Sequence, residues 1–116
     1  LIERFEDKWE WYRLSHNQSL PWSIELVERY GDKWNWGGLS LSRSLPWSLE
    51  LIERFEDKWN WECLSVNQSL PWSVEIIAHF KDKWLWESLL QCEQAVLALP
   101  KLSMQDIDEI MTFHFL

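Results

Sequence analysis

Apolar residues recur along this chain at steps of three and four, and short polar segments separate the apolar runs. Residues 23–34, SIELVERYGDKW, place Leu26, Val27, Tyr30 and Trp34 at this spacing. That period is typical of a helix with one buried face. A serine precedes each such segment and a glutamate follows two residues later, as expected for a side-chain cap and for negative charge at a helix N-terminus. The predicted N-caps are Ser23, Ser48 and Ser73.

The whole pattern returns every 25 residues and aligns as LPWSxELIERFEDKWxWxxLSxNxS, which predicts a tandem repeat. We number the copies first to fourth by the tryptophan of their DKW segment, at positions 9, 34, 59 and 84. A unit too small to bury much surface with leucine and valine can use tryptophan instead, because each aromatic side chain buries roughly 150 to 250 Å². All 11 tryptophans are therefore predicted core residues: Trp9, Trp34, Trp59, Trp84, Trp11, Trp36, Trp61, Trp86, Trp22, Trp47 and Trp72.

A second short helix is predicted in each copy, because the apolar period restarts after the aspartate of DKW. Its predicted caps are Asp7, Asp32, Asp57 and Asp82. Residues two apart on a helix differ in direction by about 200°, so the two tryptophans of DKWxW should point to opposite sides. One would face its own repeat and the other the next repeat. In the fourth copy the apolar pattern runs on, which predicts a helix over 82–100 that ends at Pro100.

These elements predict an all-α fold, a short α-solenoid of two-helix repeats. The array would cover 1–90 as about three and a half repeats, and residues 87–116 would form a divergent C-terminal helical cap of the same domain. In the cap, Ser103 is a predicted N-cap and Ile107, Ile110 and Met111 form an apolar set. LIERFEDKW at 1–9 matches 51–59 in every residue, so the array should start within a repeat of a longer protein. A repeat face exposed at Leu1 could then be covered by a second copy of the chain.

An alternative fold is a leucine-rich-repeat-like α/β solenoid, because LSxNxxL at 14–20 and 64–70 is similar to the asparagine motif of that class. The apolar residue that the class needs two positions before the motif leucine is missing in most copies. Asn17 and Asn67 are therefore predicted to cap turns, with Ser42 in the same role in the second copy.

The combination LPWSxELIERFEDKWxWxxLSxN resembles a tryptophan-rich repeat of about 25 residues that occurs in tandem in proteins of bacteria and large DNA viruses. The resemblance covers residues 1 to about 90. It implies a repeat scaffold and no established activity.

The net charge of −8 disfavours nucleic acids and anionic membrane surfaces as partners. The lysines of DKW and the arginines of the first helix could form a basic ladder, but neighbouring acidic residues should pair with them. No apolar run reaches the roughly 18 residues of a membrane span, and the lack of a recognisable signal peptide favours the cytoplasm. Cys63 and Cys92 do not follow the repeat period and are predicted to be buried or half-buried thiols.

No catalytic, metal or cofactor site is predicted. The chain has no nucleophile elbow or phosphate loop, and its three histidines and two cysteines show no ligand spacing. The recurring acidic residues are explained by helix capping. We therefore expect a protein without enzymatic activity or a bound cofactor.

The positions just after each tryptophan pair vary between copies, with Tyr-Arg, Gly-Gly, Glu-Cys and Glu-Ser at 12–13, 37–38, 62–63 and 87–88. A site that accepts such different side chains should face solvent, since packed sites respond to changes of one methylene. The predicted function is a scaffold for protein interaction or assembly, and the predicted partner-binding residues are Tyr12, Arg13, Glu62 and Glu87. The alternatives are recognition of a small ligand or carbohydrate through exposed tryptophans, and homopolymeric structural assembly.

Overall fold

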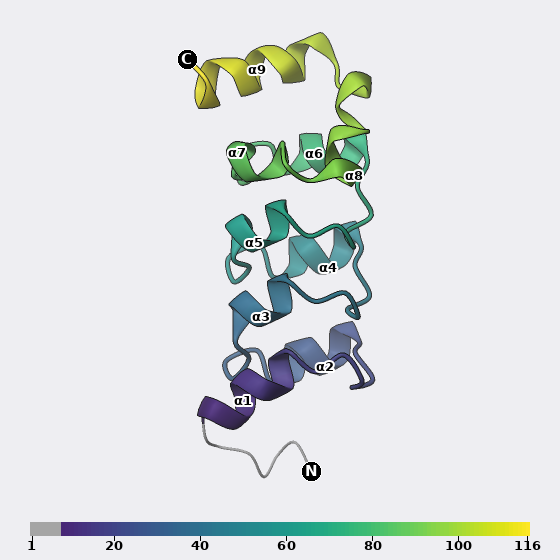
Figure 1. Cartoon of the computed structure of the whole chain (residues 1–116), viewed down its shortest axis with the longest axis vertical. Helices are drawn as coiled ribbons and strands as arrows, with labels where there is room; N and C mark the ends of the chain where they lie inside the picture. The colour runs from purple at the N-terminus through teal and green to yellow at the C-terminus, as the bar shows by residue number, and fades with distance from the viewer. Residues whose placement is uncertain (1–7) are drawn as a thin grey trace. The chain divides into compact units, whose positions relative to one another are not determined.

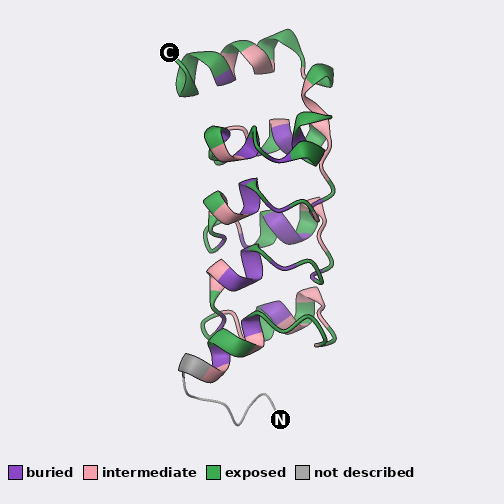
Figure 2. Cartoon of the chain, in the orientation of Figure 1, coloured by how far each residue is buried: buried purple, intermediate pink, exposed green. Residues whose placement is uncertain are grey.

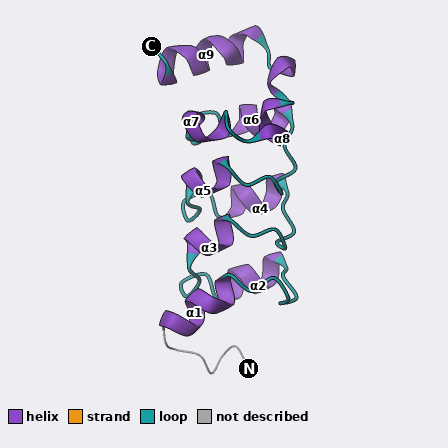
Figure 3. Ribbon diagram, viewed as in Figure 1, coloured by secondary structure: helices purple, strands orange, loops and turns teal. Residues whose placement is uncertain are grey.

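A computed structural model describes residues 8–116, and their side chains from Glu10 onward. The chain forms two compact units, 1–60 and 61–116, and the division falls within the third copy. The described residues are helical and contain no β-strand (Figure 3). The predicted all-α class is therefore confirmed for this part of the chain, and the leucine-rich-repeat-like alternative is wrong there.

Unit 1 contains four short helices, and α3 packs against α1 (Figure 1). Their bounds are α1 Lys8–Ser15, α2 Ile24–Arg29, α3 Trp36–Ser40 and α4 Leu49–Arg54. The serine caps were predicted correctly, because Ser23 and Ser48 each accept a hydrogen bond from a backbone N–H in the first turn, at 3.1 Å. The buried faces of α2 and α4 carry Val27, Leu51 and Ile52 (Figure 2).

Unit 2 begins with the same pattern and ends differently. In it α7 packs against α5, and the 3-10 helix η2 packs against α6. The bounds are α5 Trp61–Ser65, α6 Val74–His79, α7 Trp86–Leu89, α8 Glu93–Val96, η2 Leu99–Lys101 and α9 Met104–His114. Ser73 caps α6 at 3.3 Å, and Ser103 caps α9 at 3.1 Å, both as predicted.

In the second, third and fourth copies the second helix starts later than predicted, at Trp36, Trp61 and Trp86, whereas α1 of the first copy includes Lys8, as predicted. Asp32, Asp57 and Asp82 lie in the turn before it and do not cap it, whereas the predicted cap Asp7 lies outside the described residues. The turn is longer because the N–H of the DKW tryptophan bonds back to the carbonyl four residues earlier, as in Trp34 to Tyr30 at 3.3 Å. Helix α3 is capped instead by Asn35, whose Oδ1 accepts from the N–H of Gly38 at 2.8 Å.

The single helix predicted over 82–100 is also wrong. Helix α7 ends at Leu89, and α8 and η2 follow as separate short helices. The N–H groups of Gln91 and Cys92 bond to carbonyls three residues back, which tightens the chain and ends α7. Leu90, Val96 and Leu97, which belong to the apolar pattern that predicted this helix, are exposed as a result.

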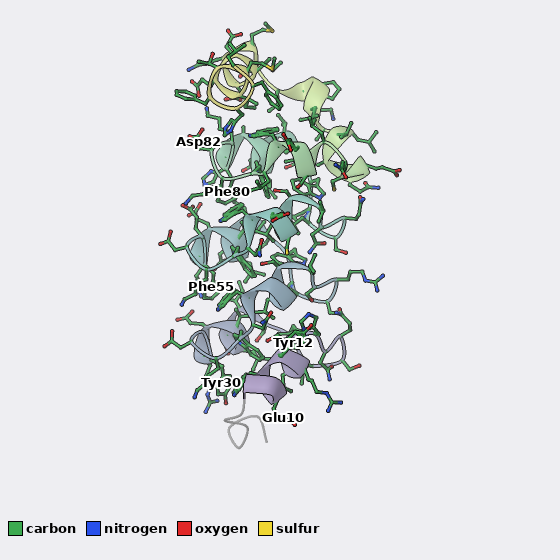
Figure 4. The ribbon with its side chains drawn as sticks, turned by 60° about the vertical axis from the view of Figure 1, so that its left-hand side comes forward. Glu10, Tyr12, Tyr30, Phe55, Phe80 and Asp82 are labelled. Atoms are coloured by element: carbon green, nitrogen blue, oxygen red, sulfur yellow. The ribbon has the colours of Figure 1, made fainter. Side chains whose placement is uncertain are left out.

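An aromatic cluster recurs wherever successive copies meet within a unit. Each cluster contains one tryptophan of a second helix: Trp11 in α1, Trp36 in α3 or Trp61 in α5. This tryptophan meets the DKW tryptophan of the next copy edge to face, with ring centroids 4.9 to 5.0 Å apart. It also meets a tyrosine or phenylalanine of that copy at 5.3 to 5.5 Å; Figure 4 labels these rings, Tyr30, Phe55 and Phe80. The full clusters are Trp11, Trp22, Tyr30 and Trp34; Trp36, Trp47, Phe55 and Trp59; and Trp61, Trp72, Phe80 and Trp84.

These clusters confirm that the two tryptophans of a pair serve different repeats. Trp36 contacts Trp59 and Phe55 of the following copy. Trp34 contacts Trp22 of its own copy and donates its indole N–H to the carbonyl of Val27 at 3.1 Å. The two tryptophans point to different repeats for another reason than predicted. Trp34 lies in a turn and only Trp36 is helical, so their directions do not result from a 200° separation on one helix.

Candidate partner-binding surface

The four residues predicted to bind a partner are all exposed. Tyr12 and Arg13 lie on α1 of unit 1, and Tyr12 is 49% exposed. Glu62 and Glu87 lie on α5 and α7 of unit 2, which pack against each other. The two glutamates therefore occupy the same position on neighbouring helices.

The ring of Tyr12 is held in place locally. It stacks on the imidazole of His16 with centroids 4.3 Å apart, and His16 Nδ1 hydrogen-bonds to the carbonyl of Tyr12 at 2.8 Å. Both side chains remain exposed. The two exposed rings, inclined by 36°, lie next to Arg13 in the sequence.

The glycine pair of the second copy does not continue this surface as predicted. Gly38 is buried and Gly37 is half-buried, whereas both were expected to face solvent. A Cβ on Gly38 would lie 2.5 Å from Cε1 of His16, so the histidine of the first copy occupies the space that a side chain would need. Position 38 is a glycine because His16 of the first copy fills the space that its side chain would occupy. Variation between copies therefore does not show that this position faces solvent.

The second members of the other pairs are only partly accessible. Cys63 and Ser88 are half-buried. Partial burial and the negative charge of Glu62 both raise the pKa of the Cys63 thiol above its ordinary value of 9.0. Cys63 is therefore protonated at neutral pH. The candidate residues are therefore Tyr12 and Arg13 on unit 1 and Glu62 and Glu87 on unit 2.

A charged groove of about 740 Å³ lies on unit 1 and contains part of the predicted basic ladder. Arg54 Nη1 pairs with Glu28 at 2.9 Å, and Lys58 Nζ pairs with Asp32 at 3.6 Å. Lys58 also lies 5.9 Å from the ring centroid of Trp36. These pairs agree with the expectation that acidic neighbours compensate the ladder, and such exposed pairs contribute little stability. The predicted start of the ladder, Arg4, lies outside the described residues.

The tryptophans differ in exposure but share the use of their polar atom. Trp11, Trp34, Trp59, Trp84 and Trp86 are buried, whereas Trp22, Trp36, Trp47, Trp61 and Trp72 are half-buried. Eight of these indole N–H groups donate to a backbone carbonyl of the chain, at 2.8 to 3.2 Å. The side chain of Trp9 lies outside the described residues, as does the repeat face predicted at Leu1.

A serine that the sequence analysis did not single out links each copy to the next. The Oγ of Ser40 donates to the carbonyl of Trp36 at 2.6 Å and accepts from the N–H of Asn60 at 2.9 Å. Ser15 and Ser65 make the same two bonds, to Asn35 and Leu85 respectively. All three are buried. Their recurrence after leucine in three copies was the available signal.

The turn residues follow the prediction. Asn17 Oδ1 accepts from the N–H of Ser19 at 2.6 Å, and Asn67 Oδ1 from that of Ser69 at 2.8 Å. In the second copy, Ser42 Oγ accepts from the N–H of Ser44 at 3.0 Å. The two turn types are interchangeable because both side chains offer an oxygen to the backbone two residues on.

Within residues 8–116, no helix combines the length and apolar character needed to cross a bilayer. The same residues contain no group of histidine, cysteine, aspartate or glutamate side chains arranged to hold a metal ion. Cys92 is buried and both cysteines are free thiols.

Comparison with protein-family models, with curated proteins and with solved structures found no match to this chain. The tryptophan-rich repeat family thus remains a resemblance carried by the sequence motif.

Proposed function

We propose that the chain is a short α-solenoid whose repeats act as a non-enzymatic scaffold for a protein partner. The support is that shared and variable positions of the repeat lie in different surroundings. Aromatic residues shared between copies form the clusters, and the serine shared by the first three copies bonds each of them to the next. Residues that change between copies, Tyr12, Arg13, Glu62 and Glu87, are exposed. Repeat proteins commonly place recognition on such a variable surface.

The use of the indole N–H groups favours this function over recognition of a sugar or small ligand by tryptophan. Orienting a polar ligand requires free donors or acceptors beside the ring, and eight indole donors already bond to the backbone. A tyrosine and an arginine side by side on α1 are residue types enriched at binding hot spots.

The proposal is tested by affinity capture with the wild-type chain and a variant carrying Tyr12→Ala, Arg13→Ala and Glu62→Ala. We expect a protein retained by the wild type to be lost by this variant, with unfolding free energy changed by no more than about 0.5 kcal/mol per site. The matched control carries Glu25→Ala and Glu75→Ala, which are exposed positions shared between copies. A partner lost equally from both variants, or kept by both, would contradict the assignment of this surface.

A further inference from the structure

The fourth tryptophan pair ends in Trp86, which lacks the aromatic neighbours of its counterparts. Trp61 meets Trp84 and Phe80 of the next copy, at centroid distances of 5.0 and 5.3 Å. Trp86 instead meets His114 of α9, at 5.9 Å with the planes inclined by 48°. The cap therefore covers Trp86 without supplying the two rings that cover the equivalent indole elsewhere.

A pocket of about 540 Å³ opens beside Trp86, and the described residues that line it are all apolar. Its floor is formed by Trp86 and Ile110, which are 6% and 5% exposed. Its rim carries Leu90, Met111 and Phe115, each between 44% and 47% exposed. This volume is within the range of ordinary ligand-binding pockets, and burying a charged group against such a lining would be costly.

The walls of the pocket are held by residues that depart from the repeat. Lys81 stands where the second and third copies have glycine and glutamate, and its Nζ pairs with Asp106 at 3.2 Å and with Glu109. His114 Nε2 lies 3.8 Å from Asp82 Oδ1 at the other end of α9. Leu90 replaces the bridging serine of the earlier copies and joins the pocket rim. Substitutions specific to this end thus fix α9 and make the surface apolar.

We propose that this pocket receives an aromatic side chain presented by a segment of a protein partner. The proposal rests on the proposed function, because it takes the occupant to be part of the bound protein. The chemistry of the occupant follows from the three equivalent indoles in this chain, each of which is covered by aromatic rings of a following polypeptide segment.

The size of the apolar surface favours a protein segment over a free small molecule. Close in sequence to Phe115 of the pocket rim, Phe113 and Leu116 are 73% and 93% exposed. Exposed apolar side chains gathered around a pocket are typical of protein interaction sites, where an aromatic anchor fills the centre and apolar residues around it exclude water.

The two methionines of the chain provide the test. Met111 lines the pocket and Met104 lies outside it on the same helix. The full chain is labelled with ¹³C at the methionine methyls and titrated with acetyl-Gly-Trp-Gly-amide or acetyl-Gly-Leu-Gly-amide. We expect the tryptophan peptide to shift the Met111 signal saturably and to leave Met104 in place. The leucine peptide should bind about threefold more weakly or worse, since ring contacts add to the burial of area.

Two substitutions on α9 form the matched pair of variants. Met111→Lys should weaken binding of the tryptophan peptide about tenfold, as measured by saturation-transfer NMR on the peptide, and Met104→Lys should leave it unchanged. Leu90→Lys changes a rim residue outside α9 and should weaken binding like Met111→Lys. It therefore controls for a local effect of the substitution on α9. Circular dichroism melts of each variant confirm that it is folded.

Three results would overturn the proposal. Equal shifts of both methionines would indicate non-specific contact, and equal binding of both peptides would indicate a general apolar groove. A Met111 signal that moves with protein concentration alone, together with association in sedimentation, would make a second copy the occupant. Peptide binding is measured without the partner, so its failure leaves the test of Tyr12, Arg13 and Glu62 intact.

Discussion

The indoles of Trp61 and Trp86 occupy the same repeat position in unit 2 and have different surroundings. Trp61 is enclosed by Phe80 and Trp84 of the next copy, and Ser65 on the same helix bonds to the N–H of Leu85. Trp86 is covered by a helix outside the repeat, and Leu90 takes the place of that serine. The fourth copy therefore differs from the third at several positions together.

These differences have a common physical origin. The buried serine hydroxyl is favourable where the next copy places a backbone N–H beside it, because that N–H would otherwise be a buried donor without an acceptor, which costs stability. Where no further copy supplies that N–H, the hydroxyl has no such role and an apolar side chain can cover the neighbouring indole. A lysine then becomes useful at position 81, because α9 brings two carboxylates to it.

The largest expected effect is the loss of a cluster tryptophan. Trp84→Ala should destabilise the fold by about 3 to 5 kcal/mol, since Trp84 is 2% exposed and contacts three other rings. Trp86→Ala should cost no more than the lower end of that range, because a pocket already adjoins this side chain. Urea denaturation of both variants provides the measurement. Equal losses would show that α9 packs on Trp86 as tightly as the neighbouring rings pack on Trp84.

A smaller effect is expected at the serine bridge. Ser65→Ala removes the acceptor of the Leu85 N–H and should cost about 1 to 3 kcal/mol. Leu90→Ser introduces the serine that the first three copies have at this position. Because Leu90 is 47% exposed, this change should alter stability by no more than about 0.5 kcal/mol. The same denaturation assay compares them. A large loss in Leu90→Ser would mean that the leucine is part of the core.

Reversing the charge at position 81 should act mainly on α9. Lys81→Glu places a third carboxylate beside Asp106 and Glu109, so the amides of α9 should exchange with solvent severalfold faster while those of α6 change less. Adding Glu109→Lys to this variant should restore protection. If the double variant stays as unprotected as the single one, the pairing does not hold α9 in place.

The smallest effect is a pH dependence of the same contact. The bond from Lys81 lowers the pKa of Glu109 below its ordinary value of 4.5, so the stability it contributes is present above that value and lost as pH falls through the lowered pKa. The bond to Glu109 raises the pKa of Lys81 above 10.5, so its contribution is present below 10.5 and lost as pH rises through the raised pKa.

Amide exchange in α9 as a function of pH checks this dependence. Protection should be highest between the two ordinary values and should fall at both extremes. In Glu109→Gln, the loss of amide protection at low pH should become smaller, because this carboxylate no longer titrates. An unchanged loss at low pH in that variant would assign the effect to other carboxylates, such as Asp106.

Local features of the fold could be predicted because they depend on neighbours in sequence. Ser48 and Ser103 cap helices that begin at the next residue, and Asn67 caps its turn, each through a bond within three residues. The site was less predictable. Exposure of Tyr12 agrees with the variation between copies, but the burial of Gly38 depends on His16, which is 22 residues away in the sequence.

The sequence by itself determined the 25-residue period, the helical class of the described residues and the identity of the capping serines, since these follow from apolar spacing and local hydrogen bonds. Only the tertiary structure decided which ring covers which indole, and that Trp34 belongs to a turn while Trp36 starts a helix. It also decided that Lys81 pairs with α9 and that Leu90 lines the pocket beside Trp86. Such contacts join residues from 12 to 28 positions apart, as in Trp22 with Trp34 and Lys81 with Glu109, and no local propensity specifies them.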